Sequence, residues 1–386
     1  MQIKVSLLSL SLLLILAACG GTPAASPPAG ATGAPPKPSV AASAATSPRT
    51  SAAVSTPPAS KPAASGVASA AAEPGALNIA YVAVSDSFLW ENIAYKRGLF
   101  QKYGVAVNEP VFVGGTPRLG AALVGGSFEL AGVGFGAAVG ADAAGSDLEG
   151  IAALSKYAAF SLILPPGSPI KDPKELKGKT IALSQIGDTA DAFLTTLLEK
   201  NGLSRSADVK VIQAGSTANA LASLLAKRVD AASVGNSDAF TGQSKGATIL
   251  TNSRELNQLQ PQGSVLVRKS WAQSHKPEVL GLLKSMLAAL ALYRSNQDQG
   301  LKLLQDSGWF KGVDPQVLAL IYKEDAANWA DLPLVDDAAV QAIVKLSAAA
   351  NPAVSKLDPK SLYDNSYLQE LVSDGFVKTV LPNYHG

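Results

Sequence analysis

The sequence predicts an α/β protein whose two lobes surround a cleft. From residue 77 onward, short apolar segments alternate with amphipathic segments of ten to fifteen residues, a pattern typical of βαβ units and parallel sheets. The pattern occurs over 77–144 and again over 180–235. Short apolar segments at 161–164 and 264–268 flank the second occurrence, so the chain should cross twice between the halves. We therefore expect each lobe to be a mixed sheet flanked by helices, with two crossover strands joining the lobes.

The first half should contribute three strands and three helices. Gly98 ends the first helix, because glycine favours a helix stop. Thr116 can cap a second helix that begins at Pro117 and ends at Gly125. In chain order the elements are strand 77–84, helix 88–97, strand 105–113, helix 117–124, strand 130–133 and helix 135–144.

The second half repeats this plan, and the chain after residue 268 becomes mostly helical. The predicted strands are 180–184, 209–213 and 231–235, and the predicted helices are 188–200, 217–227, 277–296, 315–328 and 338–350. Gly202 stops the helix at 188–200. The first lobe should then span 76–164 together with 266–386, and the second lobe should span 165–265.

The N-terminal residues indicate export and lipid anchoring. Residues 5–18 form an apolar run of fourteen residues, shorter than the roughly twenty that a spanning helix needs and typical of a signal-peptide core. The run ends in Leu-Ala-Ala-Cys at 16–19, which resembles a bacterial lipobox. That resemblance implies a signal peptide over 1–18 and acylation of Cys19. The alternative is an ordinary secreted protein with an incidental cysteine.

A linker is expected between Cys19 and the folded part. Residues 20–75 contain no Leu, Ile, Phe, Tyr or Trp, so they cannot bury enough apolar surface to offset the entropy of ordering. A flexible chain of this length spans about 40 Å. We expect 19–75 to be a disordered, lipid-anchored tether, with O-glycosylation or a partner motif as the alternatives.

Charge and composition exclude several classes of protein. Residues 1–75 hold four basic residues and one acidic residue, so the chain's net charge of +2 becomes about −1 for residues 76–386. The sequence has no basic run that would argue for nucleic acid. Cys19 is the only cysteine, so no disulfide can form within the chain. No segment after the leader is long and apolar enough to span a membrane.

Five segments in order resemble the type 2 periplasmic binding proteins. They are 97–105 (RGLFQKYGV), 114–116 (GGT), 123–131 (LVGGSFELA), 171–182 (KDPKELKGKTIA) and 224–232 (LLAKRVDAA). The similarity covers roughly 77–300 and is greatest to the SsuA/THI5-like branch, which serves ABC importers of nitrate, sulfonate, taurine and thiamine precursors. It implies the two-lobed type 2 fold and a bound small molecule. The sequence departs from many relatives at Asn-Ser-Asp (236–238), where they carry an aromatic or acidic ligand-contacting stretch.

The candidate ligand-binding residues follow the predicted strands. In open α/β sheets, ligands bind beyond the carboxyl ends of the strands, where helix N-termini favour anions and glycines allow close backbone approach. Hydroxyl, amide and carboxylate groups there can orient a ligand, and aromatic rings can form apolar walls. The candidates are Ser85, Asp86, Ser87, Phe88, Trp90, Gly115, Thr116, Gly134, Phe135, Ser184, Gln185, Asp188, Thr189, Asn236 and Asp238.

Several of these residues have a structural alternative. Thr116 and Asp188 can act solely as helix caps, and Trp90 lies two residues into a helix, where core packing would explain it. Gly125 and Gly202 are expected to be helix stops only.

The charges at these strand ends suggest the kind of ligand. Asp86, Asp188 and Asp238 are the charged side chains among them, and the strand-end segments contain no Lys or Arg. A like charge is unfavourable in a cleft of low dielectric constant. We therefore expect a neutral polar or amine-bearing ligand. In the alternative, the three aspartates face their own helix starts and leave N–H groups free for an anion.

The sequence favours binding over catalysis. The two histidines, His275 and His385, lie away from the predicted strand ends, and the sequence has no Ser/His/Asp arrangement, phosphate loop or metal-spaced cluster. We expect no catalytic residues, no cofactor, no metal and no nucleic-acid partner. The expected function is that of an extracytoplasmic, membrane-anchored monomer that captures a small polar molecule and delivers it to an ABC permease. The alternatives are a receptor for a membrane sensor kinase, or an enzyme on the same fold.

Overall fold

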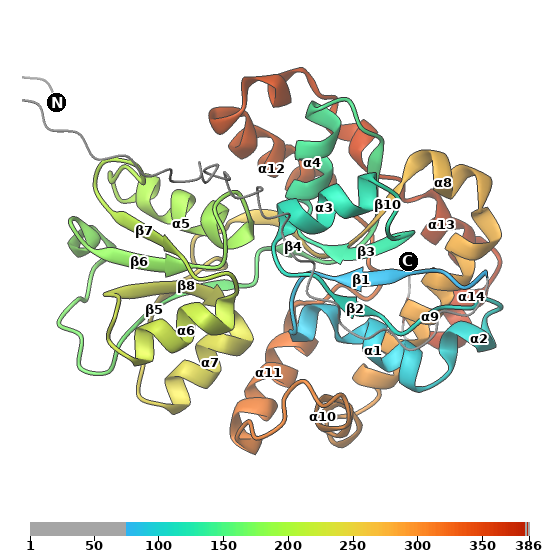
Figure 1. Cartoon of the computed structure of the whole chain (residues 1–386). Coiled ribbons are helices and arrows are strands. Elements are labelled where there is room, and N and C mark those ends of the chain that lie inside the picture. The colour runs from blue at the N-terminus through green and yellow to red at the C-terminus, as the bar shows by residue number, and fades with distance from the viewer. Residues whose placement is uncertain (1–74, 383, 385–386) are drawn as a thin grey trace, which may run out of the picture. The chain divides into compact units, whose positions relative to one another are not determined.

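The computed structural model describes residues 75–382 and residue 384. The predicted signal peptide, Cys19 and residues 19–74 of the predicted linker lie outside the described residues. The described chain forms two lobes, each built on a five-stranded sheet with helices on both faces (Figure 1). This confirms the predicted two-lobed α/β fold with mixed sheets.

The sheet of the first lobe is mixed. Its strands are ordered β2-β1-β3-β10-β4. Strand β1 pairs in parallel with β2 and β3, whereas β10 pairs antiparallel with both β3 and β4. The bounds are β1 (Ile79–Tyr81), β2 (Val111–Phe112), β3 (Leu130–Val133), β4 (Leu148–Tyr157) and β10 (Leu259–Arg268).

Alternating side chains give this sheet two apolar faces. Ile79 and Leu130 join one core cluster, with helices α1, α9, α11 and α13, whereas the adjacent Ala80 and Ala131 join another, with α3, α4 and α12. Successive residues of a strand point to opposite faces, which explains this division. The helices of the lobe are α1 (Leu89–Lys96), α2 (Leu99–Lys102), α3 (Thr116–Val124), α4 (Gly136–Ala143), α8 (Lys269–Ser274), α9 (Lys276–Arg294), α10 (Gln297–Asp306), α11 (Pro315–Asn328), α12 (Asp337–Ala350), α13 (Ser366–Ser373) and α14 (Phe376–Val380), with the short helices η1 (Asp86–Phe88), η3 (Pro352–Lys356) and η4 (Pro359–Leu362).

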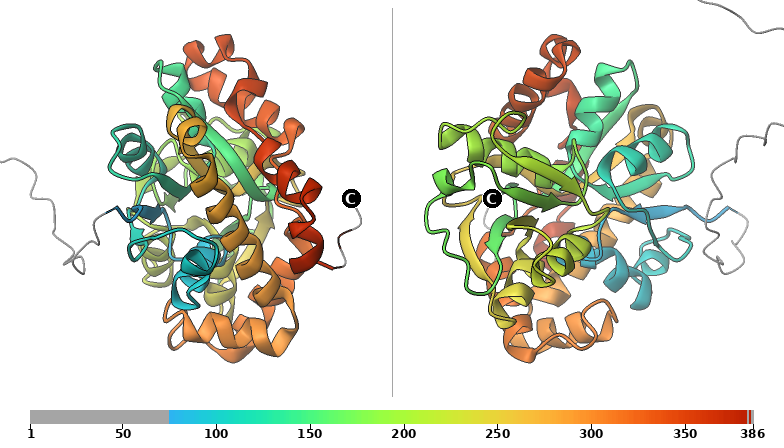
Figure 2. Two further views of the ribbon diagram at one scale, coloured as in Figure 1. Left: turned by 90° about the vertical axis from the view of Figure 1, so that its right-hand side faces the viewer. Right: turned by 60° about the vertical axis from the view of Figure 1, so that its left-hand side comes forward.

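The second lobe repeats the design. Its sheet has the order β7-β6-β8-β5-β9, in which β6 pairs in parallel with β7 and β8, and β5 runs antiparallel to β8 and β9. Helix α5 covers one face, and α6 and α7 cover the other (Figure 2). The elements are β5 (Phe160–Leu164), η2 (Pro173–Leu176), β6 (Thr180–Leu183), α5 (Thr189–Lys200), β7 (Lys210–Gln213), α6 (Thr217–Leu225), β8 (Ala231–Gly235), α7 (Asn236–Ser244) and β9 (Thr248–Asn252).

The two strands at the expected lobe boundaries belong to other parts of the fold than the sequence predicted. Strand β5 hydrogen-bonds to β8 and β9 and therefore belongs to the second sheet, although the boundary was expected after residue 164. Strand β10 belongs to the first sheet over its whole length, although the return was expected only at residue 266. The chain crosses at Ala158 and Ala159 and again over 253–258, where Ala158 N donates to Gln258 O at 3.4 Å. Main-chain pairing, which the apolar pattern does not reveal, decides which sheet each strand joins.

Several predicted elements differ in length or were not predicted. Strand β2 has two residues instead of nine, because Pro110 has no N–H to continue the ladder. Helix α3 begins at Thr116, and its N-cap is Gly115 with no side-chain cap, so the expected capping role of Thr116 is wrong. Strand β4 and helix α7 were not predicted: β4 is buried along eight consecutive residues and shows no alternation, and α7 consists largely of small and polar residues.

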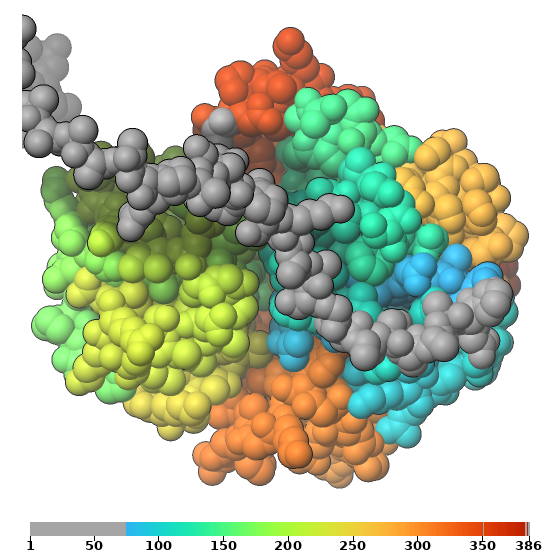
Figure 3. Space-filling view, in the orientation of Figure 1, coloured from blue at the N-terminus to red at the C-terminus, as the bar shows by residue number. Residues whose placement is uncertain are grey.

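The lobes also touch away from the crossings. Helix α11 of the first lobe packs against α7 of the second, seen in Figure 3 where the orange and yellow surfaces meet. Asn236 at the start of α7 donates to Glu324 on α11 over 3.4 Å. Within the described residues, no helix has the length and apolar character to cross a membrane.

Candidate ligand-binding site

A cavity of about 300 Å³ lies between the two lobes. The segments that follow β1, β2 and β3 line it from the first lobe, and the segments that follow β6, β7 and β8 line it from the second. The carboxyl ends of six strands therefore meet at one place, as the topology of open α/β sheets requires. Its volume is at the lower end of the range for small-molecule sites.

Twelve of the fifteen candidate residues line this cavity. They are Ser85, Asp86, Ser87, Phe88, Gly115, Thr116, Gly134, Ser184, Asp188, Thr189, Asn236 and Asp238. Residues up to 153 positions apart in the chain, Ser85 and Asp238, thus line one cavity, because parallel strands align their carboxyl ends.

The other three candidates lie elsewhere. Trp90 is buried on α1 in the core beneath the first sheet, which agrees with the packing alternative. Phe135 is fully buried, with its ring against the backbone of Gly150. Trp90 is the second residue of α1 and Phe135 immediately precedes α4, and both helices pack against the first sheet, so both side chains are in the core of the first lobe and neither forms a wall of the cavity. Gln185 is placed at the lobe contact and does not line the cavity.

The structure adds lining residues that sequence reasoning missed. Residues 215–218 follow β7, and the same strand-end rule could have found them. Phe112 at the end of β2 and Phe160 at the start of β5 supply aromatic walls. Gln262 comes from β10, and its Nε2 atom lies 3.5 Å from Ser87 Oγ. No sequence signal marked Phe160 or Gln262, because pairing between distant strands brings them to the cavity.

Two glycines allow the lobes to meet. A methyl group on Gly115 would lie 2.0 Å from Oε1 of Gln185, which comes from the second lobe, and Gly115 also has a φ of +89°, a conformation that favours glycine. A methyl group on Gly134 would lie 2.8 Å from Oγ1 of Thr189 and 3.0 Å from Oγ1 of Thr116. Thr116 and Thr189 therefore approach each other over Gly134 from opposite lobes.

Asp188 is both a helix cap and a cavity residue. Its Oδ1 accepts from Asp191 N at 3.1 Å, and its Oδ2 accepts from Gln185 N at 3.1 Å and from the hydroxyl of Ser184. Burial raises the pKa of Asp188 to about 6, although the hydrogen bonds from Ser184 and from Asp191 N oppose the shift. The expected capping role is present, and the carboxyl still lines the cavity.

Asp86 links the cavity to a buried network. It is 7% exposed and is hydrogen-bonded to Asp325 of α11. Tyr293 donates through its hydroxyl to Asp325 Oδ2 at 2.6 Å. Burial raises the pKa of Asp325 well above its ordinary value, and the neighbouring carboxyl of Asp86 adds to the shift.

Asp238 is the third carboxyl of the cavity and lies in the first turn of α7. Burial raises its pKa, and the nearby charge of Asp86 adds to that shift, whereas a hydrogen bond from Thr217 opposes it. Asp86 comes from the first lobe and Asp238 from the second, so carboxyls of both lobes face the same cavity.

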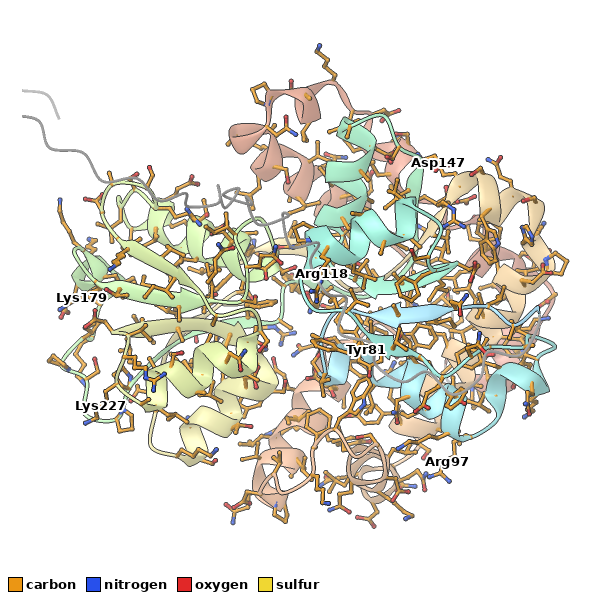
Figure 4. All side chains as sticks on the ribbon, in the orientation of Figure 1. Tyr81, Arg97, Arg118, Asp147, Lys179 and Lys227 are labelled. Atoms are coloured by element: carbon orange, nitrogen blue, oxygen red, sulfur yellow. The ribbon has the colours of Figure 1, made fainter. Side chains whose placement is uncertain are left out.

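The cavity carries negative charge without a compensating cation. Its described lining residues include three aspartates and no Lys, Arg or His. Arg118 is exposed on α3 near the boundary between the lobes (Figure 4), but it is not among the lining residues. The described part of the chain contains no group of three or more His, Cys, Asp or Glu residues that could hold a metal ion.

Two α/β lobes that the chain joins twice, with a cavity at their strand ends, define a periplasmic binding protein fold of type 2. A model of the family described as "NMT1/THI5 like" matches residues 91–299. The chain belongs to this family, which confirms the resemblance expected from the sequence.

Solved structures share the fold. A protein of Bordetella bronchiseptica RB50 is 21% identical with a TM-score of 0.69, over 80% of this chain and 98% of that chain. The alkanesulfonate-binding protein SsuA of Xanthomonas axonopodis pv. citri, bound to MOPS, is 26% identical with a TM-score of 0.60, over 75% of this chain and 96% of that one. The periplasmic nitrate-binding protein NrtA of Synechocystis PCC 6803 is 13% identical with a TM-score of 0.62, over 80% of this chain and 91% of that chain. The search of curated proteins found no match.

Proposed function

We propose that this protein is an extracytoplasmic solute-binding protein that captures a small polar molecule between its lobes and delivers it to an ABC importer. The observation that carries the proposal is the cavity at the strand ends, lined from both lobes by hydroxyl, amide and carboxylate groups. Membership of the NMT1/THI5-like family supports it, as do the sulfonate- and nitrate-binding proteins among the structures with this fold.

The ligand in this proposal is neutral or carries an amine. Asp86, Asp188 and Asp238 line the cavity and would repel an anion in a site of low dielectric constant. An ammonium group would instead be attracted and could form charge-assisted hydrogen bonds with these carboxylates. The apolar lining from Phe88 and Phe112 suits the remainder of a small organic molecule.

An anion would need a different set of contacts. The N-termini of α3 and α7 have no side-chain cap, so backbone N–H groups of their first turns could contact an anion, although Pro117 has no N–H and Asn236 N already donates to Ala159 O. Arg118 could add a positive charge if it turned inward. The related proteins named for sulfonate and nitrate bind anions, so this chain would differ from them in the charge of its ligand.

The proposed mechanism is capture by closure. The lobes hinge about Ala158–Ala159 and 253–258, and the ligand bridges both lobes, which stabilises the closed state by differential affinity. The glycines at 115 and 134 let Gln185 and Thr189 reach the first lobe. Small-angle scattering with a bound ligand should show compaction; an unchanged radius of gyration would argue against hinge closure.

Calorimetric titration tests the ligand class. Candidate probes are MOPS, nitrate, a set of primary amines and neutral pyrimidines. We expect saturable binding of an amine or a neutral polar molecule, and weaker amine binding for Asp238→Asn. Asp298→Asn, an exposed change on α10 outside the cavity, is the matched control. Tight binding of nitrate or of a sulfonate without an amine would contradict the proposed ligand class.

Anchoring and the downstream partner are separate parts of the proposal. Cleavage before Cys19 and its acylation would hold the lobes at the membrane through a tether of about 56 residues. One acyl chain gives marginal binding, so stable anchoring needs a diacylglyceryl group. Release of a Cys19→Ser variant from membranes would support this, and equal membrane retention would oppose it. Loss of ligand uptake in a deletion strain would favour an importer, whereas lost signalling with normal uptake would favour a sensor kinase.

A further inference from the structure

A second cavity, of about 480 Å³, lies between the lobes beside the first. Helices α4 and α12 and the short helix η3 line it from the first lobe, and α5 lines it from the second. Figure 1 shows α5, α4 and α12 on the same side of the two sheets. The volume exceeds that of the first cavity and is within the range of small-molecule sites.

The wall of this second cavity is largely apolar on the side of the first lobe. Val139 of α4, Ile343 and Leu346 of α12 and Val354 of η3 contribute to it. Ile186 faces them from the second lobe and is 47% exposed. An apolar molecule between these walls would be removed from water on both sides, which is favourable in proportion to the area it buries.

Gln260 supplies a polar group without a partner at this cavity. The side chain is 1% exposed, and its Nε2 lies 3.3 Å from Oγ1 of Thr189. Its Oε1 has no hydrogen-bond partner among the described residues. The hydroxyl of Thr189 can either donate or accept, so the Gln260 amide can be turned either way. The amide atom that does not pair with Thr189 is then either the carbonyl oxygen or the NH₂ group. A buried polar group in this state is unfavourable unless another molecule satisfies it.

Arg205 supplies a second free group. Its Nε is paired with Asp191 Oδ1, while Nη2 is buried and has no partner among the described residues. Its charge is already compensated by Asp191, and Asp188 and Glu199 also line the cavity. A ligand with a net negative charge would therefore meet an excess of carboxylates, whereas a neutral acceptor could bind Nη2.

Three residues separate the two cavities. Thr116, Asp188 and Thr189 line both of them. The hydroxyls of Thr116 and Thr189 converge within 3.0 Å of the methyl position of Gly134, so these side chains form a partition between the cavities. A molecule in the second cavity would touch both lobes and the far side of this partition.

We propose that the second cavity is a separate binding site for a small neutral molecule with an apolar body and a primary amide end. The amide NH₂ would satisfy Gln260 Oε1, its carbonyl oxygen would accept from Arg205 Nη2, and the body would pack on α4 and α12. Because such a molecule contacts both lobes, it favours the closed arrangement and strengthens binding in the first cavity, and the reverse holds by reciprocity. This coupling rests on the proposed function, whereas binding in the second cavity does not.

Hexanamide is the probe for the binding test, with hexanoate and hexylammonium as charged probes of the same length. We expect saturable binding of hexanamide by ligand-observed NMR and calorimetry, and weaker binding of both ions. Gly140→Phe should abolish hexanamide binding: Gly140 lines the cavity, and a side chain there has open space around its Cβ. Ala121→Phe, an exposed change on α3 that lines neither cavity, is the matched control.

A second variant tests the polar anchor. Gln260→Met keeps a similar length without the amide, and it should weaken hexanamide binding about tenfold, as expected for a lost hydrogen bond. Failure to reach saturation at the solubility limit, equal binding by Gly140→Phe, or stronger binding of hexanoate would each overturn the site. Saturable hexanamide binding that does not change the affinity of the first cavity for its ligand would contradict the coupling but would still support binding in the second cavity.

Discussion

Replacement of Gly134 by alanine should weaken ligand capture without unfolding the protein. The new methyl group would lie 2.8 Å from Thr189 Oγ1 and 3.0 Å from Thr116 Oγ1, where ordinary contact begins near 3.4 Å. Thr189 belongs to the second lobe, so part of the strain can be relieved when the lobes separate by about half an ångström at this point. The closed state is therefore penalised more than the open one.

The magnitude follows from the cost of overpacking. An inserted methyl group in a well-packed site costs about 1–3 kcal/mol. If the closed state bears this cost, affinity for a ligand that bridges the lobes falls about 5- to 150-fold. The midpoint of thermal unfolding should change little in the absence of ligand, because the open lobes relieve the contact with Thr189.

The assay combines calorimetry with small-angle scattering. Gly134→Ala should bind the ligand more weakly and show less compaction than the unmodified protein. Gly136→Ala is the matched control, because no atom outside its own helix and chain neighbours lies within 4 Å of that methyl position. Adding Thr189→Ala to Gly134→Ala removes the clashing oxygen and should restore compaction. Unchanged affinity and compaction in Gly134→Ala would refute the reasoning.

The remaining predictions concern three carboxyl groups. Because burial raises the pKa of Asp188 to about 6, amine affinity should fall by up to about tenfold per pH unit below pH 6, and an equally steep profile in Asp188→Asn would contradict this. Glu91 is fully buried without a hydrogen-bond partner among the described residues, and burial raises its pKa well above 4.5. The folded state then binds this proton more tightly, so the free energy of unfolding should decline as the pH rises from about 4.5 through the raised pKa; denaturant titrations should show that Glu91→Met removes this decline. Asp325→Asn should preserve stability because the amide oxygen can still accept from Tyr293, whereas Asp325→Leu leaves Tyr293 without its acceptor and should cost about 1–3 kcal/mol; equal denaturation midpoints for both variants would be inconsistent with the network.

The strand ends of the cavity were predictable because they depend on local signals. Ser85, Thr116, Ser184 and Asn236 each follow an apolar segment and precede a helical one, and topology alone brings such positions together. Trp90 could not be placed in the same way. A residue two positions into a helix can lie on the helix face toward the cavity or on the face toward the core. Only the packing of α1 against α9 decides that Trp90 is buried in the core.

The partition and the second cavity required the tertiary structure. Gly134 and Thr189 are 55 positions apart in sequence, and nothing in either segment indicates that they meet. Gln260 lies in β10, which the sequence predicted only from residue 264 onward. No sequence signal therefore marked Gln260 or its unpartnered oxygen. Contacts between lobes depend on how two sheets are placed, and local patterns carry no information about that.

The sequence by itself determined the α/β class, the number of lobes, the family and most of the residues at the strand ends, because hydrophobic periodicity and glycine stops are local properties of the chain. The tertiary structure alone decided which sheet β5 and β10 join, which carboxyls share an environment and where the lobes touch. These features arise from main-chain pairing and burial between distant segments, whose free energies depend on the whole arrangement of the fold.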